Sequence, residues 1–283
     1  MKKNLVLSVV SESTLFEYLL ANVSGMSRNN LKSALKRGQI LVDGKSRKDY
    51  ALALKPGQKV EVVMGNVKAV SLPFPIMYED SEILVINKPA GLLAIGSDKD
   101  NINTAYHAVT DYVKSSGGKG DRVFVVHRLD RDTSGLMLFA KNDKLKFAFQ
   151  DNWEELCIFR GYTALVEGQM EDSEGTVSSW LRQTKTLLMY SSQTQGDGKF
   201  AVTKYRVLRC SPETSLLDIE IKTGRKNQIR VHMSDLGHPI VGDKKYGAKT
   251  NPLGRLGLHA SKLTIKHPFN DRVLEFVSDS KFK

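Results

Sequence analysis

The sequence predicts an α+β protein whose main sheet is mixed and mostly antiparallel. Short apolar runs typical of strands outnumber the segments with helical spacing, and the two kinds do not alternate as in a βαβ fold. The composition also changes along the chain. Residues 1–64 form a small unit with its own apolar pattern, and residues 65–75, with two prolines, are typical of a linker. We therefore expect an N-terminal domain of residues 1–64 and a larger domain of residues 76–283.

In the N-terminal unit we expect two short helices followed by a small sheet. Apolar residues recur at helical spacing in residues 13–22. Ser27 is a favoured N-cap for a second helix over residues 28–37, which Gly38 would end. Strands are expected at residues 40–42 and 59–63, between the turns at residues 43–44 and 56–57.

Three basic residues of the second helix, Arg28, Lys32 and Lys36, are spaced four apart and therefore share one face. Residues 11–64 resemble the small RNA-binding domain first described in a ribosomal small-subunit protein. The resemblance implies that this face contacts RNA phosphates, which position a protein without reading sequence. The alternative is a solvated helix face on a structural domain.

The larger unit is expected to hold most of the strands. Helical spacing recurs at residues 103–114, 143–152 and 228–236. Apolar runs with strand character lie at residues 83–86, 124–126, 136–140, 162–166, 204–208 and 216–221.

The charge of the chain favours a polyanionic partner. The formal net charge is +11, and both ends of the chain are basic while residues 71–221 are mildly acidic. Basic surfaces bind nucleic acid by releasing its counterions. An anionic membrane would need an amphipathic helix with large apolar anchors, and the sequence shows none. A merely solvated surface remains the alternative.

Other classes of site are not supported by the sequence. Cys157 and Cys210 lack metal or redox spacing, and His232, His238 and Asp243 are too irregularly spaced for a metal site. No P-loop or dinucleotide-binding motif is present, so we expect no cofactor and no metal. No apolar run approaches the length of a membrane span and no signal peptide is recognisable, so we expect a cytoplasmic protein.

The polar segment 127–135 lies between two apolar strands and holds two Asp, two Arg and a His. Loops between strands often carry functional groups. Its carboxylates, Asp130 and Asp132, could instead be turn residues, because Asp, Thr, Ser and Gly are favoured in turns. As neighbours on one loop they are a poor pair for glycoside hydrolysis.

Four stretches occur in the order found in one enzyme family. They are Asn-Lys-Pro-Ala-Gly-Leu at 87–92, His-Arg-Leu-Asp at 127–130 with Thr-Ser-Gly-Leu at 133–136, Arg-Gly-Tyr-Thr-Ala-Leu-Val-Glu-Gly at 160–168, and the segment 223–247 with Thr-Gly-Arg at 223–225 and Gly-Asp at 242–243. Over residues 74–270 the chain thus resembles the RluA-type pseudouridine synthases, which modify large-subunit ribosomal RNA and transfer RNA. The resemblance implies the pseudouridine synthase fold.

The resemblance gives each matched residue a role in converting uridine to pseudouridine. Asp130 would be the nucleophile or base that breaks the glycosidic bond. Arg230 would be its bidentate counter-ion, and Tyr162 would stack on the detached base. Arg128 would fill the space left by the flipped uridine, and Arg225 would contact phosphate.

The sequence indicates the substrate and the partners less directly than the catalytic residues. The expected partner is structured RNA, with large-subunit ribosomal RNA favoured and transfer RNA as the alternative, and we expect a monomer. Asn227 stands where the family commonly has His, which bears on RNA contacts. Two rivals remain open: a non-catalytic RNA-binding ribosome-assembly factor, and a hydrolase that uses Asp130 with Asp132.

Overall fold

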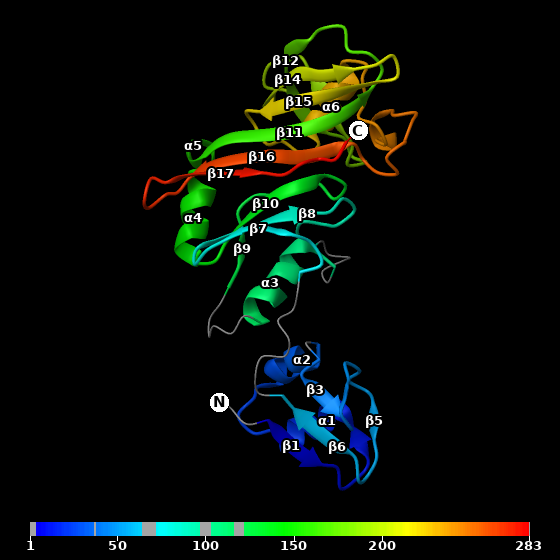
Figure 1. Ribbon diagram of the computed structural model, residues 1–283, viewed down its shortest axis with the longest axis vertical. Helices are drawn as coiled ribbons and strands as arrows, with labels where there is room; N and C mark the ends of the chain where they lie inside the picture. The colour runs from blue at the N-terminus through cyan, green and yellow to red at the C-terminus, as the bar shows by residue number, and fades with distance from the viewer. Residues whose placement is uncertain (1–3, 37, 64–71, 97–102, 116–121, 283) are drawn as a thin grey trace. The chain divides into compact units, whose positions relative to one another are not determined.

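The computed structural model describes residues 4–36, 38–63, 72–96, 103–115 and 122–282, without the side chain of Lys36 (Figure 1). The chain divides into two compact units, Met1–Ser71 with Asp111–Lys119, and Leu72–Thr110 with Gly120–Lys283. The linker expected at residues 65–75 lies largely outside the described residues. The domain limits 1–64 and 76–283 stay a prediction.

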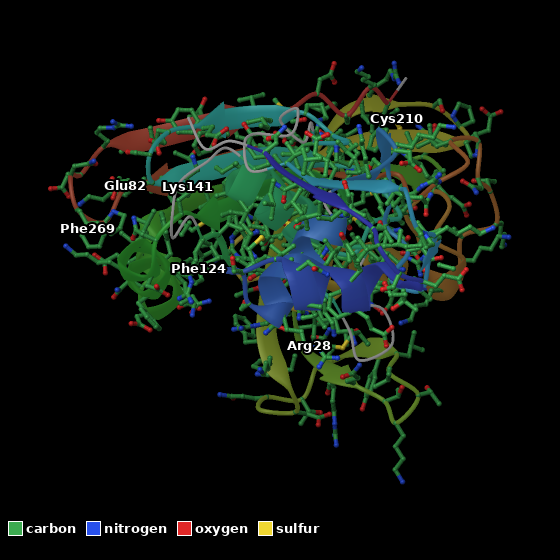
Figure 2. The ribbon with its side chains drawn as sticks, turned by 90° about the horizontal axis from the view of Figure 1, so that it is seen from below. Arg28, Glu82, Phe124, Lys141, Cys210 and Phe269 are labelled. Atoms are coloured by element: carbon green, nitrogen blue, oxygen red, sulfur yellow. The ribbon has the colours of Figure 1, made fainter. Side chains whose placement is uncertain are left out.

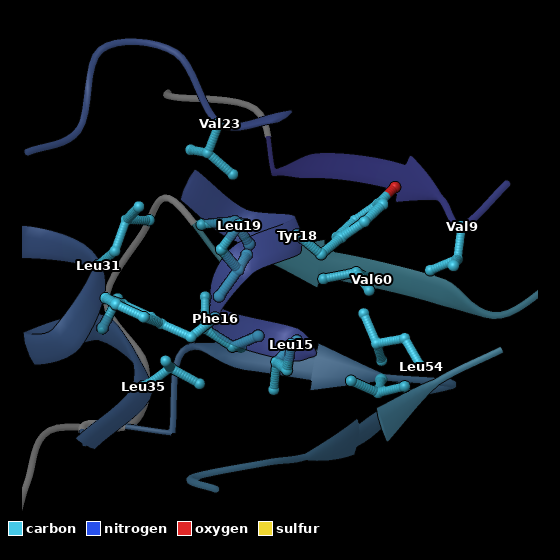
Figure 3. Close-up of a cluster of buried hydrophobic side chains, with 14 residues drawn as sticks. Val9, Leu15, Phe16, Tyr18, Leu19, Val23, Leu31, Leu35, Leu54 and Val60 are labelled. Atoms are coloured by element: carbon cyan, nitrogen blue, oxygen red, sulfur yellow. The ribbon is translucent and has the colours of Figure 1, made fainter. Parts of the chain in front are cut away.

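The first unit pairs two helices with small antiparallel sheets around one apolar core. The helices are α1 (Leu15–Asn22) and α2 (Arg28–Lys36). One sheet runs β1 (Leu5–Ser8), β6 (Lys59–Val62), β3 (Ile40–Val42) and β4 (Lys45–Ser46); the other pairs β2 (Ser13–Thr14) with β5 (Ala53–Leu54). Figure 3 shows Leu15 and Leu19 of α1 within this core, with Leu31 and Leu35 of α2.

Side-chain caps mark the starts of both helices in the first unit. The expected cap at Ser27 is confirmed, whereas α1 begins at Leu15, two residues later than expected, after Thr14. Ser27 Oγ accepts a hydrogen bond from the Asn30 amide at 3.2 Å, and Thr14 Oγ1 accepts one from the Glu17 amide at 3.4 Å. Such bonds satisfy amides that have no partner within the helix.

The basic face of α2 is present in part. Arg28 and Lys32 are exposed, and each places its charge 5.8 Å from the centre of the Phe16 ring. Figure 2 shows Arg28 beside the blue ribbon of the first unit. The side chain of Lys36 lies outside the described residues, so its place on this face stays a prediction.

The second unit is built on a sheet of eleven strands among the described residues. In spatial order its main path is β13 (Met189–Ser192), β12 (Glu174–Gln183), β14 (Lys199–Cys210), β15 (Thr214–Ile221), β11 (Cys157–Glu167), β16 (Leu258–Lys266), β10 (Ser134–Ala140), β8 (Ile83–Lys88) and β7 (Ile76–Glu79). β17 (Val273–Val277) pairs with β16, and β9 (Phe124–Val125) pairs with β10. The described pairs are antiparallel except β10 with β16, which confirms the predicted fold class.

Helices accompany this sheet, and clusters of buried apolar residues join three of them to its strands. The helices are α3 (Ala105–Ser115), α4 (Asp143–Asp151), α5 (Trp153–Leu156) and α6 (Gln228–Asp235), with a 3-10 turn, η1, at Lys244–Tyr246. One core joins α4 and α5 to β8, β10 and β17, and another joins α6 to β11 and β15. None of the described helices is long and apolar enough to cross a membrane.

The parallel pair of β10 and β16 depends on Gly135. Its φ is +117°, and a Cβ at this position would lie 2.3 Å from the carbonyl oxygen of Ala260 on β16. Only glycine allows the two backbones to approach so closely. This contact anchors the end of the 127–135 segment against the centre of the sheet.

Candidate active site

A cleft of about 350 Å³ brings together the residues that the sequence analysis singled out. Its walls come from the segment before β10, from β11, and from the turn that leads into α6. Asp130, Tyr162 and Arg230 line it, together with Arg128 and Arg225. These five residues are up to 102 positions apart in the chain, and the sheet places them around one hollow.

The 127–135 segment is held from behind by a histidine. His127 Nε2 accepts a hydrogen bond from the Leu138 amide at 3.1 Å, and its ring stacks on Trp153 at 5.1 Å between centroids. Burial lowers the pKa of His127 to about 4, aided by the charge of Arg160. The neutral ring can therefore serve as an acceptor, and it fixes the backbone just before Asp130.

A buried lysine ties the segment to β8. Lys88 is fully buried, and its ammonium donates to the carbonyl oxygens of Pro89 (2.9 Å), Leu92 (2.8 Å) and Arg131 (3.0 Å). Burial lowers its pKa to about 8, while the carboxylates of Asp132 and Asp130 act in the opposite direction. Because it is buried and bound to three carbonyl oxygens, Lys88 is neither a solvated charge nor a phosphate contact. It stabilises the backbone that carries Asp130.

Burial dominates the electrostatics of Asp130. It raises the pKa of this carboxyl above the ordinary value of 3.8. The opposing positive charges are, in order of effect, those of Arg230, Arg128, Lys226 and Lys88. The cations therefore reduce the cost of ionising Asp130 without cancelling it.

The bidentate contact expected between Arg230 and Asp130 is made to another carboxylate. Arg230 is 8% exposed, and its Nε and Nη2 donate to the two oxygens of Asp243 at 2.6 and 2.7 Å. The guanidinium also lies 5.0 Å from the centre of the Tyr246 ring. The charge of Arg230 still opposes the rise in the pKa of Asp130, so Arg230 acts on that carboxyl through space.

Asn227 belongs to the same network. It has a left-handed backbone with φ of 54°, which Asn tolerates better than most residues. Its Oδ1 accepts from Arg230 Nη1 at 3.3 Å, and its Nδ2 donates to the Tyr246 hydroxyl at 2.8 Å. The departure from the family's usual His therefore falls on a buried residue that orients Arg230.

Asp243 and Tyr246 are the residues of this network whose part the sequence analysis missed. Asp243 had been weighed only as an improbable metal ligand. The Gly-Asp pair at 242–243 lay within the resemblance, and a buried Arg requires a carboxylate partner. That requirement was the available signal.

Tyr162 lies in β11 and is paired with Ile219 on one side and Ala260 on the other. Burial raises the pKa of its phenol to about 12, so the hydroxyl stays protonated at neutral pH. The ring packs against the core beneath α6 and lines the cleft. It can offer a face to a base and a proton donor to a developing charge.

The remaining predicted residues lie at the rim or outside the cleft. Arg128 is exposed, and Arg225 Nε donates to the Phe200 carbonyl oxygen at 3.0 Å. Lys226 also lines the cleft. Asp132 is exposed and is not part of the lining, which does not favour a hydrolase that pairs it with Asp130.

The side chains that the sequence analysis considered as metal ligands have hydrogen-bonding partners within the protein. His232 is buried between the hydroxyls of Ser179 (3.0 Å) and Thr203 (2.8 Å), and Asp243 is held by Arg230. Within the described residues no group of three His, Cys, Asp or Glu side chains could hold a metal ion.

Residues 82–235, which hold most of the residues lining this cleft, match the family model described as RNA pseudouridylate synthase. The fold and the cleft are therefore those of an RNA-modifying enzyme. The chain therefore belongs to the RNA pseudouridylate synthase family, and the RluA-type resemblance is confirmed.

Individual relatives agree over most of the chain. The uncharacterized RNA pseudouridine synthase YlyB of Bacillus subtilis is 32% identical, over 92% of this chain and 88% of the relative. The ribosomal large subunit pseudouridine synthase D of Zymomonas mobilis is 31% identical, over 91% of this chain and 87% of the relative. Among solved structures, human RNA pseudouridylate synthase domain containing 4 aligns with a TM-score of 0.60 and 26% identity, over 76% of this chain and 92% of that chain.

Proposed function

We propose that this pseudouridine synthase modifies uridines in structured RNA, with large-subunit ribosomal RNA as the favoured substrate. The observation that carries the proposal is the placement of Asp130, Tyr162 and Arg230 around one cleft with exposed arginine at its rim. The name of the Zymomonas mobilis relative supports ribosomal RNA over transfer RNA.

In this proposal Asp130 starts the reaction on a uridine that has left its stack. Its carboxylate attacks or deprotonates the nucleoside, and the bond from the sugar to N1 of uracil breaks. The base then turns, and the sugar is joined to carbon 5, which loses its hydrogen as a proton while N1 gains one. The isomerisation balances without an oxidant or a cofactor.

The neighbours of Asp130 have separate tasks. Tyr162 offers its ring to the detached base, so that the base can turn without leaving the cleft. Arg230 supplies a fixed positive charge that favours the ionised form of Asp130. Arg128 would occupy the space left in the RNA and hold a phosphate, which would offset part of the few kcal/mol that flipping costs.

The first unit would anchor the RNA outside the cleft. Arg28 and Lys32 present positive charge on the face of α2, and Lys36 is expected to extend that face. The affinity that such contacts provide falls steeply as the salt concentration rises, because each contact releases a counterion. We expect RNA affinity to weaken strongly between low and moderate salt.

The experiment that tests this function is a pseudouridine map of total RNA from cells with and without the gene. Rescue with wild type, Asp130→Asn and Asp132→Asn provides a matched pair of variants on one loop. Sites restored by wild type and Asp132→Asn, but not by Asp130→Asn, would name the substrate and identify the carboxylate. An unchanged map in the absence of the gene would favour the assembly-factor alternative, and equal damage from both variants would favour a hydrolase.

A further inference from the structure

A second hollow of about 410 Å³ adjoins the catalytic cleft within the second unit. Its lining consists of Ile95, Tyr106, Phe124, Val125, Val126, Arg128, Lys146 and Gln150. Val126 and Arg128 line the catalytic cleft as well, so the two hollows share a wall. We call this second hollow the side pocket. Its volume is in the range of small-molecule sites, roughly 300–1,000 Å³.

The inside of the side pocket is suited to a flat, partly apolar group. Phe124 of β9 and Tyr106 of α3 contribute aromatic rings, and Ile95 contributes an aliphatic wall. Figure 2 shows Phe124 beside the green ribbon of α4. Aromatic side chains bind unstacked bases with little sequence preference, because every base has a π-face.

The rim of the side pocket is cationic and polar. Lys146 places its ammonium 5.4 Å from the centre of the Phe124 ring and 4.5 Å from that of Phe147. Gln150 is exposed, and its Nε2 donates to the Val125 carbonyl oxygen at 3.3 Å. With Arg128 on the shared wall, the rim offers positive charge and hydrogen-bonding groups around an aromatic floor.

We propose that the side pocket binds the base of a nucleotide that neighbours the target uridine in the same RNA strand. The inference rests on the proposed function. Arg128 would then lie near the phosphate that joins the two nucleotides, with one base on each side of the wall that carries it. Unstacking a second base has a free-energy cost, and stacking in the pocket offsets that cost.

The assignment makes the enzyme sensitive to a base that it does not modify. The test uses synthetic RNA hairpins of a mapped target loop, in which the nucleotide before or after the uridine is replaced by an abasic residue. The phosphates remain, so electrostatic binding is retained. We expect the single-turnover rate of pseudouridine formation at subsaturating enzyme to fall about tenfold for one of the two positions.

Two variants locate the effect in the side pocket. In Tyr106→Leu and in Lys146→Ala, the ratio of rates between the normal and the abasic RNA should fall toward one. Phe124 is not the first choice, because its ring also packs against the core. The matched control is Lys144→Ala, since Lys144 is on the same helix and also lies over a ring, that of Phe269 at 4.3 Å. The control should keep the wild-type ratio.

The outcomes separate the two proposals. If wild type forms no pseudouridine in the normal hairpin, the proposed function fails and the side-pocket assignment fails with it. If wild type modifies the normal and both abasic hairpins at equal rates, the proposed function stands and the side-pocket assignment is overturned. Equal loss of the ratio in Lys144→Ala and Lys146→Ala would also overturn it.

Discussion

Replacing Asp243 by Asn should destabilise the protein through the charge left on Arg230. Asp243 is 2% exposed, and both of its oxygens accept from the guanidinium. Asparagine has the same size but carries one oxygen and one NH₂ group. One hydrogen bond from Arg230 therefore survives, whereas at the other position the NH₂ group and a guanidinium N–H are two donors that face each other. Removing one partner of a buried ion pair costs about 3–5 kcal/mol.

The structure favours the lower end of this range. Asn227 keeps its hydrogen bond to Arg230, and the guanidinium keeps its contact with the Tyr246 ring. The charge of Asp130 is also nearby, since it interacts electrostatically with Arg230. We therefore expect Asp243→Asn to lose about 3 kcal/mol of unfolding free energy.

The measurement is urea unfolding at pH 7, with the free energy extrapolated to zero denaturant. The matched control is Asp218→Asn, the same change in an exposed ion pair with Arg206 whose side chains are 43% and 64% exposed. Exposed pairs contribute roughly 0–1 kcal/mol. A loss for Asp243→Asn that is no larger than the loss for Asp218→Asn would refute the reasoning.

Three further changes test other parts of the site. Asp130→Asn should raise the free energy of unfolding at pH 7, because burial raises the pKa of Asp130 and its ionised form therefore costs stability. That gain should disappear as the pH falls below 3.8, the ordinary pKa of an Asp carboxyl, because the carboxyl is then protonated in both the folded and the unfolded state. Urea unfolding between pH 3 and 7 checks this expectation, and a gain that stays constant with pH would contradict it. Lys88→Met should lower the free energy of unfolding by about 2 kcal/mol in the same assay and slow pseudouridine formation, because three carbonyl oxygens lose their donor. Wild-type stability and rate in this variant would show that the ammonium is dispensable. Gly135→Ala should abolish soluble, folded protein, as judged by circular dichroism, whereas Gly254→Ala, where a Cβ meets nothing within 4 Å, should cost only about 1 kcal/mol.

Much of the fold could be predicted because its signals are local. The N-cap at Ser27, the apolar run at residues 83–86 and the alternation in residues 216–221 depend on neighbours in the sequence. The clustering of Asp130, Tyr162 and Arg230 was predicted differently. It came from the resemblance, because no local pattern indicates which distant strands adjoin.

The strands that the sequence did not predict carry polar residues on their buried faces. In β16, His259 is buried, and its Nδ1 lies 2.8 Å from the Ser134 hydroxyl while its Nε2 lies 3.1 Å from that of Ser278. Burial lowers the pKa of His259 to about 4, so the ring is neutral. Such a residue is an acceptable interior group because both ring nitrogens have hydroxyl partners, one of them 125 positions away. β12 was missed for a similar reason, since its buried Ser179 faces His232.

Two arginines of the cleft differ in their partners: Arg230 is paired with a carboxylate, and Arg128 lies exposed at the rim. Arg230 and Asp243 together are close to neutral, so their pair contributes little net attraction for RNA, although the Arg230 guanidinium still favours the ionised form of Asp130. Arg128 is exposed and acts on the same carboxyl from the rim. A phosphate bound to Arg128 would neutralise part of that charge and would raise the pKa of Asp130 further. Because the bound RNA would thus weaken one of the cations that favour ionisation, we expect the charges that stay fixed during turnover to be those of Arg230, held by Asp243, and of buried Lys88.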